Sequence, residues 1–351
     1  TDARRIRDIF ASTGGEIVKA DILQPAETLL DLYGEDIRAR AYVTQDPVQG
    51  EMMLRPDFTL PIVQMHMQNR VEPARYAYSG KVFRKQEQET GRPSEYIQVG
   101  YEVFDGRSPP LADAEVFSLV STALKGANLR PATGDIGILM AAVRGLRTSQ
   151  PRKDALMRHI WRPARFRRLL ERFGGRSAVP PSRAALIKAQ VPVADGMTHI
   201  GLREISEISE RVSALKADAD EPAISSGEVD LLEDLLRYGG KCDAALTYLR
   251  DLSVDLPEIG GAVARMARRL TALDERGVDV SDLDFEASYG RSQMEYYDGF
   301  VFGFYAENRP DLPPVATGGR YDAMTRRLGQ GQSIPAIGAV VRPALLLEAQ
   351  T

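Results

Sequence analysis

The segments RYAYSGKVFR at residues 75–84 and EYIQVGYEVFD at residues 95–105 decide how this chain folds. Residues alternate along both segments as they do in strands. Gly91 and Pro93 interrupt the charged residues between them. We therefore predict a long antiparallel hairpin.

The second strand of this hairpin has two unlike faces. One is predicted to face the core and carries Ile97, Val99, Tyr101 and Val103. The other carries Tyr96, Gln98, Gly100, Glu102 and Phe104. An amide and a carboxylate here flank a glycine, whose missing side chain leaves room above the sheet, so this face is predicted to form the floor for a small polar ligand. A solvated sheet face is the other interpretation that the spacing permits.

The composition is that of an ordinary soluble protein with one large or two ordinary domains. The chain has 351 residues, of which 43% are hydrophobic, and a net charge of −4. This charge gives no general attraction to nucleic acid or to an anionic membrane, and neither is expected as a partner. No apolar run approaches about 18 residues and no signal peptide is visible, so we expect a cytoplasmic protein. The first residue, Thr1, leaves open whether native residues precede it.

Cysteine and histidine usage gives no sign of a metal or redox site. Cys242 is the only cysteine, so the chain can form neither an internal disulfide nor a thiolate cluster, and we expect a buried, inert thiol. His66, His159 and His199 are scattered without metal-ligand spacing. We expect no metal and no cofactor.

The N-terminal part is predicted to alternate helices with short strands. We expect a helix over residues 4–10, a strand that runs into Pro25, a helix over 26–33, a hairpin over 41–55 and a helix over 60–68. Just before the last helix, Asp57 and Thr59 stand two residues apart. A carboxylate and a hydroxyl placed together can hold an ammonium group. A helix cap is the alternative role for Asp57.

Later segments suggest a core interrupted by helices. We predict a helix that begins at Asp113, a short strand over 135–139 and a helical insertion over 146–280, which divides the core into residues 1–145 and 281–351. Residues 152–176 are rich in arginine. A nucleic-acid patch is one interpretation, but without interleaved aromatic residues to stack on bases we favour a solvated helix face or a protein contact.

Several motifs together resemble those of histidyl-tRNA synthetases. ValPheArg at 82–84, GlyArg at 91–92 and TyrIleGlnValGlyTyrGlu at 96–102 are similar to motif 2 of that family, and LeuArgProAspPheThr at 54–59, the pair Tyr296 and Tyr297, and GlyGlyArgTyrAsp at 318–322 are similar to its histidine-binding motifs. The resemblance implies an α+β fold, a class II aminoacyl-tRNA synthetase-like antiparallel sheet flanked by helices, and a homodimer formed around Pro25.

The same resemblance implies a histidine-binding pocket. Its residues would be Asp57, Thr59, Arg84, Gln98, Glu102, Tyr296, Tyr297 and Tyr321. Glu102 would accept from an imidazole N–H, and Asp57, Thr59 and Gln98 from the ammonium. Since neighbouring residues of a strand point to opposite faces, we expect only one of Tyr296 and Tyr297 to face the pocket.

The departures from the family pattern fall on its ATP-binding and transition-state residues. An arginine is missing at Ser94, Ser292 and Leu345, and a glutamate at Gln86 and Ala344, while Arg342 replaces a glycine. Arg291 is one position away from the missing arginine at 292 and is expected to face the opposite side of a strand. Because adenylation needs placed guanidinium groups, the resemblance implies a binding protein with no catalytic residues.

A synthetase-like core without motif 3 or an anticodon-binding domain resembles the regulatory subunits of ATP phosphoribosyltransferase. That family implies a non-catalytic chain for the first step of histidine biosynthesis, which assembles with a short-form catalytic subunit and takes part in histidine feedback. Two other hypotheses remain open. One is a divergent aminoacyl ligase without an anticodon domain, and the other is a sensor of tRNA-shaped RNA, which only the basic stretch supports.

Overall fold

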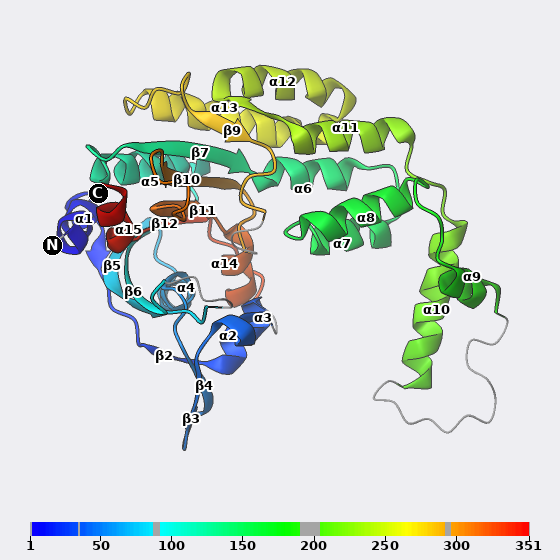
Figure 1. The fold of residues 1–351 in the computed structure, drawn as a ribbon, viewed down its shortest axis with the longest axis horizontal. Helices are drawn as coiled ribbons and strands as arrows, with labels where there is room; N and C mark the ends of the chain where they lie inside the picture. The colour runs from blue at the N-terminus through cyan, green and yellow to red at the C-terminus, as the bar shows by residue number, and fades with distance from the viewer. Residues whose placement is uncertain (1, 34–35, 87–91, 190–203, 292–295, 351) are drawn as a thin grey trace.

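The structure is a computed structural model that describes residues 2–33, 36–86, 92–189, 204–291 and 296–350. Figure 1 shows a sheet with its covering helices at one end of the molecule and a run of helices that extends from it toward α9 and α10. Among the described residues, no helix is both apolar enough and long enough to cross a bilayer.

Nine strands of the described residues form the main sheet, in the order β1-β5-β6-β12-β11-β10-β7-β9-β8. Neighbouring strands are antiparallel except for the pairs β1·β5 and β7·β9, which are parallel. The strands are β1 (Glu16–Ile17), β5 (Ala74–Phe83), β6 (Glu95–Phe104), β7 (Leu129–Asp135), β8 (Gly239–Lys241), β9 (Asp284–Glu286), β10 (Phe300–Ala306), β11 (Ala316–Arg320) and β12 (Ala336–Val341). A small separate sheet has the order β2-β4-β3, with β2 (Leu23–Pro25), β3 (Val43–Asp46) and β4 (Gly50–Leu54).

The helices of the first and last parts of the chain pack beside the main sheet or, for α2 and α3, beside the small one. They are α1 (Asp2–Ser12), α2 (Ala26–Tyr33), α3 (Asp36–Arg40), α4 (Thr59–Asn69), α5 (Pro109–Ala123), α6 (Ile136–Gly145), α14 (Asp322–Leu328) and α15 (Pro343–Ala349). The remaining helices, which we call the helical part, are α7 (Gln150–Arg158), α8 (Pro163–Phe173), α9 (Pro181–Lys188), α10 (Ile205–Asp220), α11 (Ser226–Arg237), α12 (Cys242–Asp255), η1 (Pro257–Ile259) and α13 (Gly260–Asp274).

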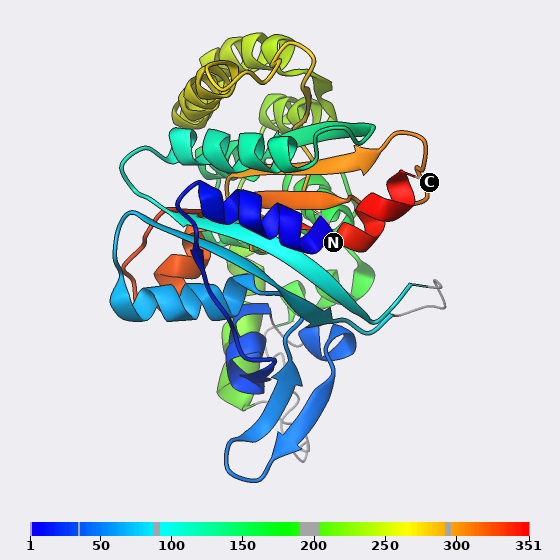
Figure 2. The same ribbon diagram turned by 90° about the vertical axis from the view of Figure 1, so that its left-hand side faces the viewer.

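The predicted hairpin is confirmed, and both of its faces are covered. Strands β5 and β6 pair from Ala74↔Phe104 to Phe83↔Glu95. Helix α1 lies across one face (Figure 2), where Phe10 packs against Tyr101. On the other face, α4 stacks His66 on Phe104 with 3.8 Å between ring centroids.

Two details of β6 differ from the prediction. Ile97 is 42% exposed, so the core face begins only at Val99. The space above Gly100 is filled, because a Cβ there would lie 2.1 Å from the ring of Tyr78, its partner across the hairpin. Gly100 therefore makes room for an aromatic ring of the protein and not for a ligand.

Two predictions about local structure near α5 and α6 were wrong. Helix α5 begins at Pro109, since proline is favoured in a first helical turn, and Asp113 lies buried within that helix. Residues 136–139 are helical, because β7 ends at Asp135 and its carboxylate then caps α6 by accepting from Gly137 N at 3.0 Å. A short apolar run does not distinguish a strand from a buried helix.

A buried ionic cluster joins the helical part to the core. Arg269 of α13 donates from Nη1 to Asp113 at 3.2 Å and from Nη2 to Asp135 at 2.9 Å. Arg320 of β11 donates to the same Asp113 from Nε at 2.9 Å and from Nη2 at 2.6 Å. Because these groups are almost fully buried, each depends on the others to offset its lost hydration.

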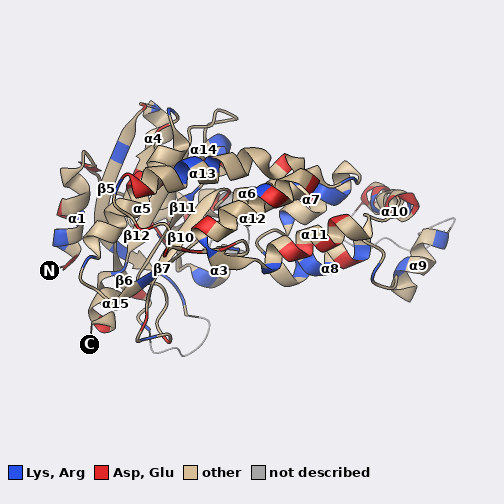
Figure 3. Cartoon of the chain, turned by 90° about the horizontal axis from the view of Figure 1, so that it is seen from above, with Lys and Arg blue, Asp and Glu red and all other residues tan. Residues whose placement is uncertain are grey.

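Part of the arginine-rich stretch pairs with acidic neighbours. Figure 3 shows acidic and basic residues interspersed along α7, α8 and α11. Arg152 donates from Nε to Asp218 at 2.6 Å, and Arg176 pairs with Asp230 at 2.6 Å. Such pairing is typical of contacts between helices and uses charge that a nucleic acid would need.

The cysteine is buried as predicted. Cys242 lies at the start of α12, and desolvation raises the pKa of its thiol to about 11. Since the thiolate is the reactive form, this side chain is inert near neutral pH.

Candidate functional site

A small polar cavity lies over the strands β6, β11 and β12, and we call it the β6 cavity. Its wall is formed by Asp57, Thr59, Arg84, Gln98, Tyr296, Tyr297, Thr317, Tyr321, Gly338, Ala339, Val340 and Arg342. These residues come from the β4–α4 turn, from three strands and from the turn before β10. Its free volume is about 20 Å³, enough for about one water molecule.

The fold brings seven of the eight predicted site residues to this one cavity, and Glu102 lies behind its wall. Tyr296 and Tyr297 both line it, so the expectation that only one would do so was wrong. The reason is that β10 begins at Phe300, and residues before a strand do not follow its alternation. The two rings meet edge to face with 4.9 Å between centroids.

Glu102 is fully buried and is held by three hydroxyl groups. Its Oε1 accepts from Thr59 at 3.1 Å and from Tyr78 at 3.0 Å, and its Oε2 accepts from Tyr321 at 2.5 Å. Desolvation, together with the charge of nearby Asp57, raises the pKa of this carboxyl to about 7 despite these three hydrogen bonds. Glu102 therefore orients two hydroxyls that face the cavity, those of Thr59 and Tyr321.

The neighbouring strand leaves space for this carboxylate. At Gly338 of β12, directly across from Glu102, a Cβ would lie 1.5 Å from Oε2. A side chain at position 338 is therefore incompatible with the buried carboxylate.

Gln98 has no hydrogen-bond partner for either atom of its amide among the described residues, although it is only 1% exposed. Leaving a buried donor or acceptor without a partner costs about 1–3 kcal/mol each. Since Gln98 lines the β6 cavity, a polar ligand there would satisfy both atoms.

Asp57 contributes little as a helix cap. Leu60 N donates to its Oδ1 at 3.5 Å, which is long for a hydrogen bond, and Phe58 holds the capping position of α4. Its carboxylate therefore contributes negative charge to the cavity wall, beside the hydroxyl of Thr59.

Two guanidinium groups separate the β6 cavity from a larger basic cavity. Arg84 and Arg342 line both, and the larger space of about 590 Å³ is also lined by Arg40, Lys85, Gln86, Arg92, Pro93, Tyr96, Ile97, Pro313, Pro314, Ala344, Leu345 and Glu348. Arg342 donates to Pro314 O at 2.9 Å and to Thr317 Oγ1 at 3.2 Å. Burial lowers its pKa, and so does the charge of Arg84, which shows how close the two cations lie.

Arg342 and Thr317 are wall residues that the sequence analysis did not assign to the pocket. The one signal for Arg342 was its departure from a family glycine. Of the other departures, Gln86, Ala344 and Leu345 line the basic cavity, Ser94 precedes β6, and Ser292 lies outside the described residues.

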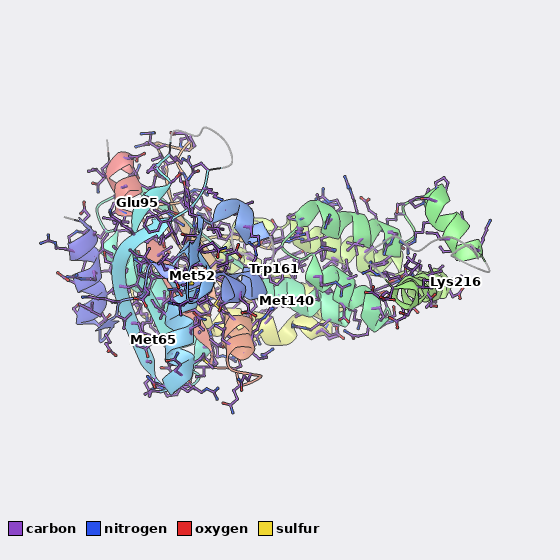
Figure 4. The ribbon with its side chains drawn as sticks, turned by 90° about the horizontal axis from the view of Figure 1, so that it is seen from below. Met52, Met65, Glu95, Met140, Trp161 and Lys216 are labelled. Atoms are coloured by element: carbon purple, nitrogen blue, oxygen red, sulfur yellow. The ribbon has the colours of Figure 1, made fainter. Side chains whose placement is uncertain are left out.

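The helical part reaches the site through one tryptophan. Trp161, between α7 and α8, donates from Nε1 to Tyr297 O at 3.1 Å. Figure 4 places its label where the sheet and the helical part meet. Arg291, expected to face away from the pocket, does not line it and instead donates from Nε to Ile160 O at 2.7 Å. It lies in a turn and not on a strand.

Among the described residues, no group of three histidine, cysteine or acidic side chains is arranged to hold a metal ion. The wall of the β6 cavity presents carboxylate, amide, hydroxyl and guanidinium groups. This set matches the ammonium and carboxylate of a free amino acid.

Comparisons with known proteins identify the family of this chain. The profile of the family described as histidyl-tRNA synthetase matches residues 2–204 and 202–346. A protein of Mesorhizobium japonicum named ATP phosphoribosyltransferase regulatory subunit is 30% identical over 360 residues, covering 96% of this chain and 94% of its own length. A protein of the same name from Brucella anthropi is 28% identical, covering 92% and 90%. The chain belongs to the family of ATP phosphoribosyltransferase regulatory subunits.

Solved structures show the same fold. A Bacillus halodurans protein described as an ATP phosphoribosyltransferase regulatory subunit/histidyl-tRNA synthetase superposes with a TM-score of 0.70 at 22% identity, covering 100% of this chain and 78% of that one. A histidyl-tRNA synthetase from Nostoc gives 0.65 at 17% identity, with 99% and 70% covered. Membership in this family makes the chain a non-catalytic regulatory component on a class II histidyl-tRNA synthetase fold.

Proposed function

We propose that the β6 cavity binds free histidine and that this chain thereby regulates a short-form catalytic subunit of ATP phosphoribosyltransferase. The observation that carries the proposal is Gln98, a buried amide without a partner among the described residues, in the wall of a cavity that also holds Asp57 and Tyr321. The names of the relatives support the regulatory role and the existence of a catalytic partner.

Each end of the amino acid has a complementary group in the wall. Asp57, Thr59 and Gln98 accept from the ammonium, and Arg84 and Arg342 donate to the carboxylate. Tyr296, Tyr297 and Tyr321 surround the imidazole. Glu102 acts from behind the wall, where its carboxylate orients the hydroxyls of Tyr321 and Thr59.

Binding requires the wall to move, because a free volume of about 20 Å³ does not admit a histidine. The candidates for movement are Tyr296 and Tyr297, which precede β10, and Arg342 at the border with the basic cavity. A ligand that displaces them would change the contact with Trp161 and so reach the helical part. Such coupling between a ligand and a partner surface typically amounts to about 1–3 kcal/mol.

The assembly is also a proposal. We place a homodimer contact around Pro25 and the small sheet, where Ile22, Leu23 and Val43 are exposed. The catalytic subunit would contact surfaces outside the β6 cavity. We also propose that the chain is divided into a core of residues 1–145 and 281–351 and an insertion of 146–280, and that the protein is cytoplasmic.

The test uses Gln98→Met, which keeps the length of the side chain and removes the amide. Histidine binding measured by calorimetry should weaken at least about tenfold, the equivalent of one lost charge-assisted hydrogen bond. Without ligand the variant should be as stable as wild type or more so, since a partnerless amide is replaced by an apolar group. Gln150→Met, on the exposed start of α7, is the control and should bind as wild type does.

The regulatory half of the proposal needs reconstitution with the purified catalytic subunit. Formation of phosphoribosyl-ATP should depend on this chain and fall when histidine is added, and the fall should be lost with Gln98→Met. If the wild-type chain binds no histidine, alone or with the catalytic subunit, the proposed pocket is wrong. If Gln98→Met retains full sensitivity to histidine, the effector site lies elsewhere.

A further inference from the structure

A second cavity, of about 490 Å³, lies between α8 and the sheet, and we call it the α8 cavity. Its wall contains Arg130 and Ala132 of β7, Pro163, Phe166 and Arg167 of α8, Leu236 of α11, Glu286, Ser288, Tyr289, Gly290 and Arg291 around the turn after β9, and Tyr305 of β10. The wall residues of the β6 cavity are all different. We propose that the α8 cavity binds the phosphate group of a small molecule.

The main observation is a buried cation without an acid. Arg291 is 5% exposed, and no carboxylate pairs with it among the described residues. Its Nε donates to Ile160 O at 2.7 Å, its guanidinium carbon lies 4.8 Å from the centroid of the Phe166 ring, and its Nη2 has no hydrogen-bond partner in the described part of the chain. A buried charge with an unused donor is costly unless an anion accompanies it.

Two further arginines line the wall, and one of them has an acidic partner. Arg167 stands on the exposed side of α8, and Arg130 pairs with Asp284 at 2.6 Å. Glu286 is the one acid in the wall formed by described residues. Because Arg130 pairs with Asp284, the two guanidinium groups of Arg291 and Arg167 face the single carboxylate of Glu286, and the wall keeps a net positive charge that attracts an anion. A phosphate, with its higher negative charge near neutral pH and its three acceptor oxygens, suits two guanidinium groups better than a carboxylate does.

The remaining wall suits a molecule larger than phosphate itself. Tyr289 and Tyr305 place their hydroxyls 2.8 Å apart, and Ser288 adds a third hydroxyl. Phe166, Leu236 and Ala132 supply apolar area. A volume of about 490 Å³ lies within the range of about 300–1,000 Å³ that is usual for small-molecule pockets. A sugar phosphate or a nucleoside monophosphate has the required size and charge.

Burial, together with the charge of Arg167, lowers the pKa of Arg291 to about 10. Arg291 and Arg167 both line the α8 cavity. A single phosphate can accept from both, in the bidentate geometry that arginine favours.

The test is calorimetric titration with inorganic phosphate and with AMP at constant ionic strength, using acetate as the carboxylate probe. The key variants are neighbours on α8: Arg167→Gln changes a wall residue, and Arg168→Gln changes an exposed residue outside the wall. We expect phosphate affinity to fall about tenfold or more with Arg167→Gln and to stay within about twofold with Arg168→Gln. Acetate should bind at least about tenfold more weakly than phosphate, because it carries half the charge.

Arg291→Met provides an independent test. It should abolish phosphate binding while the thermal midpoint without phosphate stays at or above the wild-type value, because an unpaired buried cation is replaced by an apolar side chain. Equal losses with Arg167→Gln and Arg168→Gln would show diffuse attraction to the whole helix and overturn the proposal. So would phosphate binding by Arg291→Met at wild-type strength, or acetate binding as tight as that of phosphate.

Discussion

Replacing Glu102 by glutamine should give a protein whose stability, compared with that of wild type, increases as the pH rises. The carboxyl of Glu102 is 0% exposed, and its pKa in the folded chain is about 7, compared with an ordinary value of 4.5. Between these values the folded state holds a proton that the unfolded state has released. Wild-type stability therefore falls as pH rises through this window and levels off above pH 7. The amide of the Glu102→Gln variant does not titrate, so the variant would not show this loss.

The magnitude follows from the two pKa values. Each pKa unit corresponds to about 1.4 kcal/mol, so the full shift is worth about 3 kcal/mol, of which about 2.5 kcal/mol develops between pH 5 and pH 8. The variant has its own pH-independent cost, because one hydroxyl around the side chain must turn to accept from the new amide. The measured quantity is therefore the change with pH in the stability difference between variant and wild type.

Urea unfolding followed by circular dichroism at pH 5, 6, 7 and 8 gives this difference. Other groups with shifted pKa values, such as Asp298 at about 7 and His66 at about 4, are present in both proteins and cancel. Glu210→Gln on the exposed face of α10 is the control and should change by less than about 0.5 kcal/mol with pH. If the stability difference between Glu102→Gln and wild type did not change with pH, or shifted in favour of wild type at pH 8, Glu102 would be ionised well below pH 7 in the folded chain.

Three further predictions concern the buried ionic cluster, Trp161 and the inability to activate histidine with ATP. Arg269→Met should destabilise the chain by about 3–5 kcal/mol in chemical unfolding, because it leaves Asp135 without its buried cation. The control, Arg268→Met on the exposed side of α13, should change stability by less than about 0.5 kcal/mol. Equal losses of stability in the two variants would refute the role of the cluster. Trp161→Phe removes the donor to Tyr297 O and should weaken histidine binding about two- to tenfold in calorimetry, with little effect on the fold. Unchanged affinity for histidine would mean that this contact does not position the wall of the β6 cavity. Histidine-dependent exchange of labelled pyrophosphate into ATP should not exceed that of a mock preparation, since Ser94, Ser292 and Leu345 stand where the family pattern has arginines. Exchange above background would restore the ligase hypothesis.

The sequence by itself determined the elements whose signals are local. The alternation along residues 95–104 predicts β6 and its antiparallel partner, because a period of two is a property of the strand itself. The residue types of the β6 cavity could also be named, since Asp57, Thr59, Gln98 and Tyr321 stand in motifs of fixed spacing.

Only the tertiary structure decided which groups face open space and which face each other. Gly100 was expected to leave room for a ligand, yet Tyr78 fills that room from the paired strand, and Glu102 turns toward three hydroxyls behind the cavity wall. Asp113 was expected at the start of a helix and instead lies within it, where it neutralises two arginines that are 156 and 207 residues away in sequence. Such contacts depend on the register between strands and on the packing of distant helices, and local periodicity carries neither. For the same reason Arg291 could be placed away from the β6 cavity, but the α8 cavity that it lines became visible only in the folded chain.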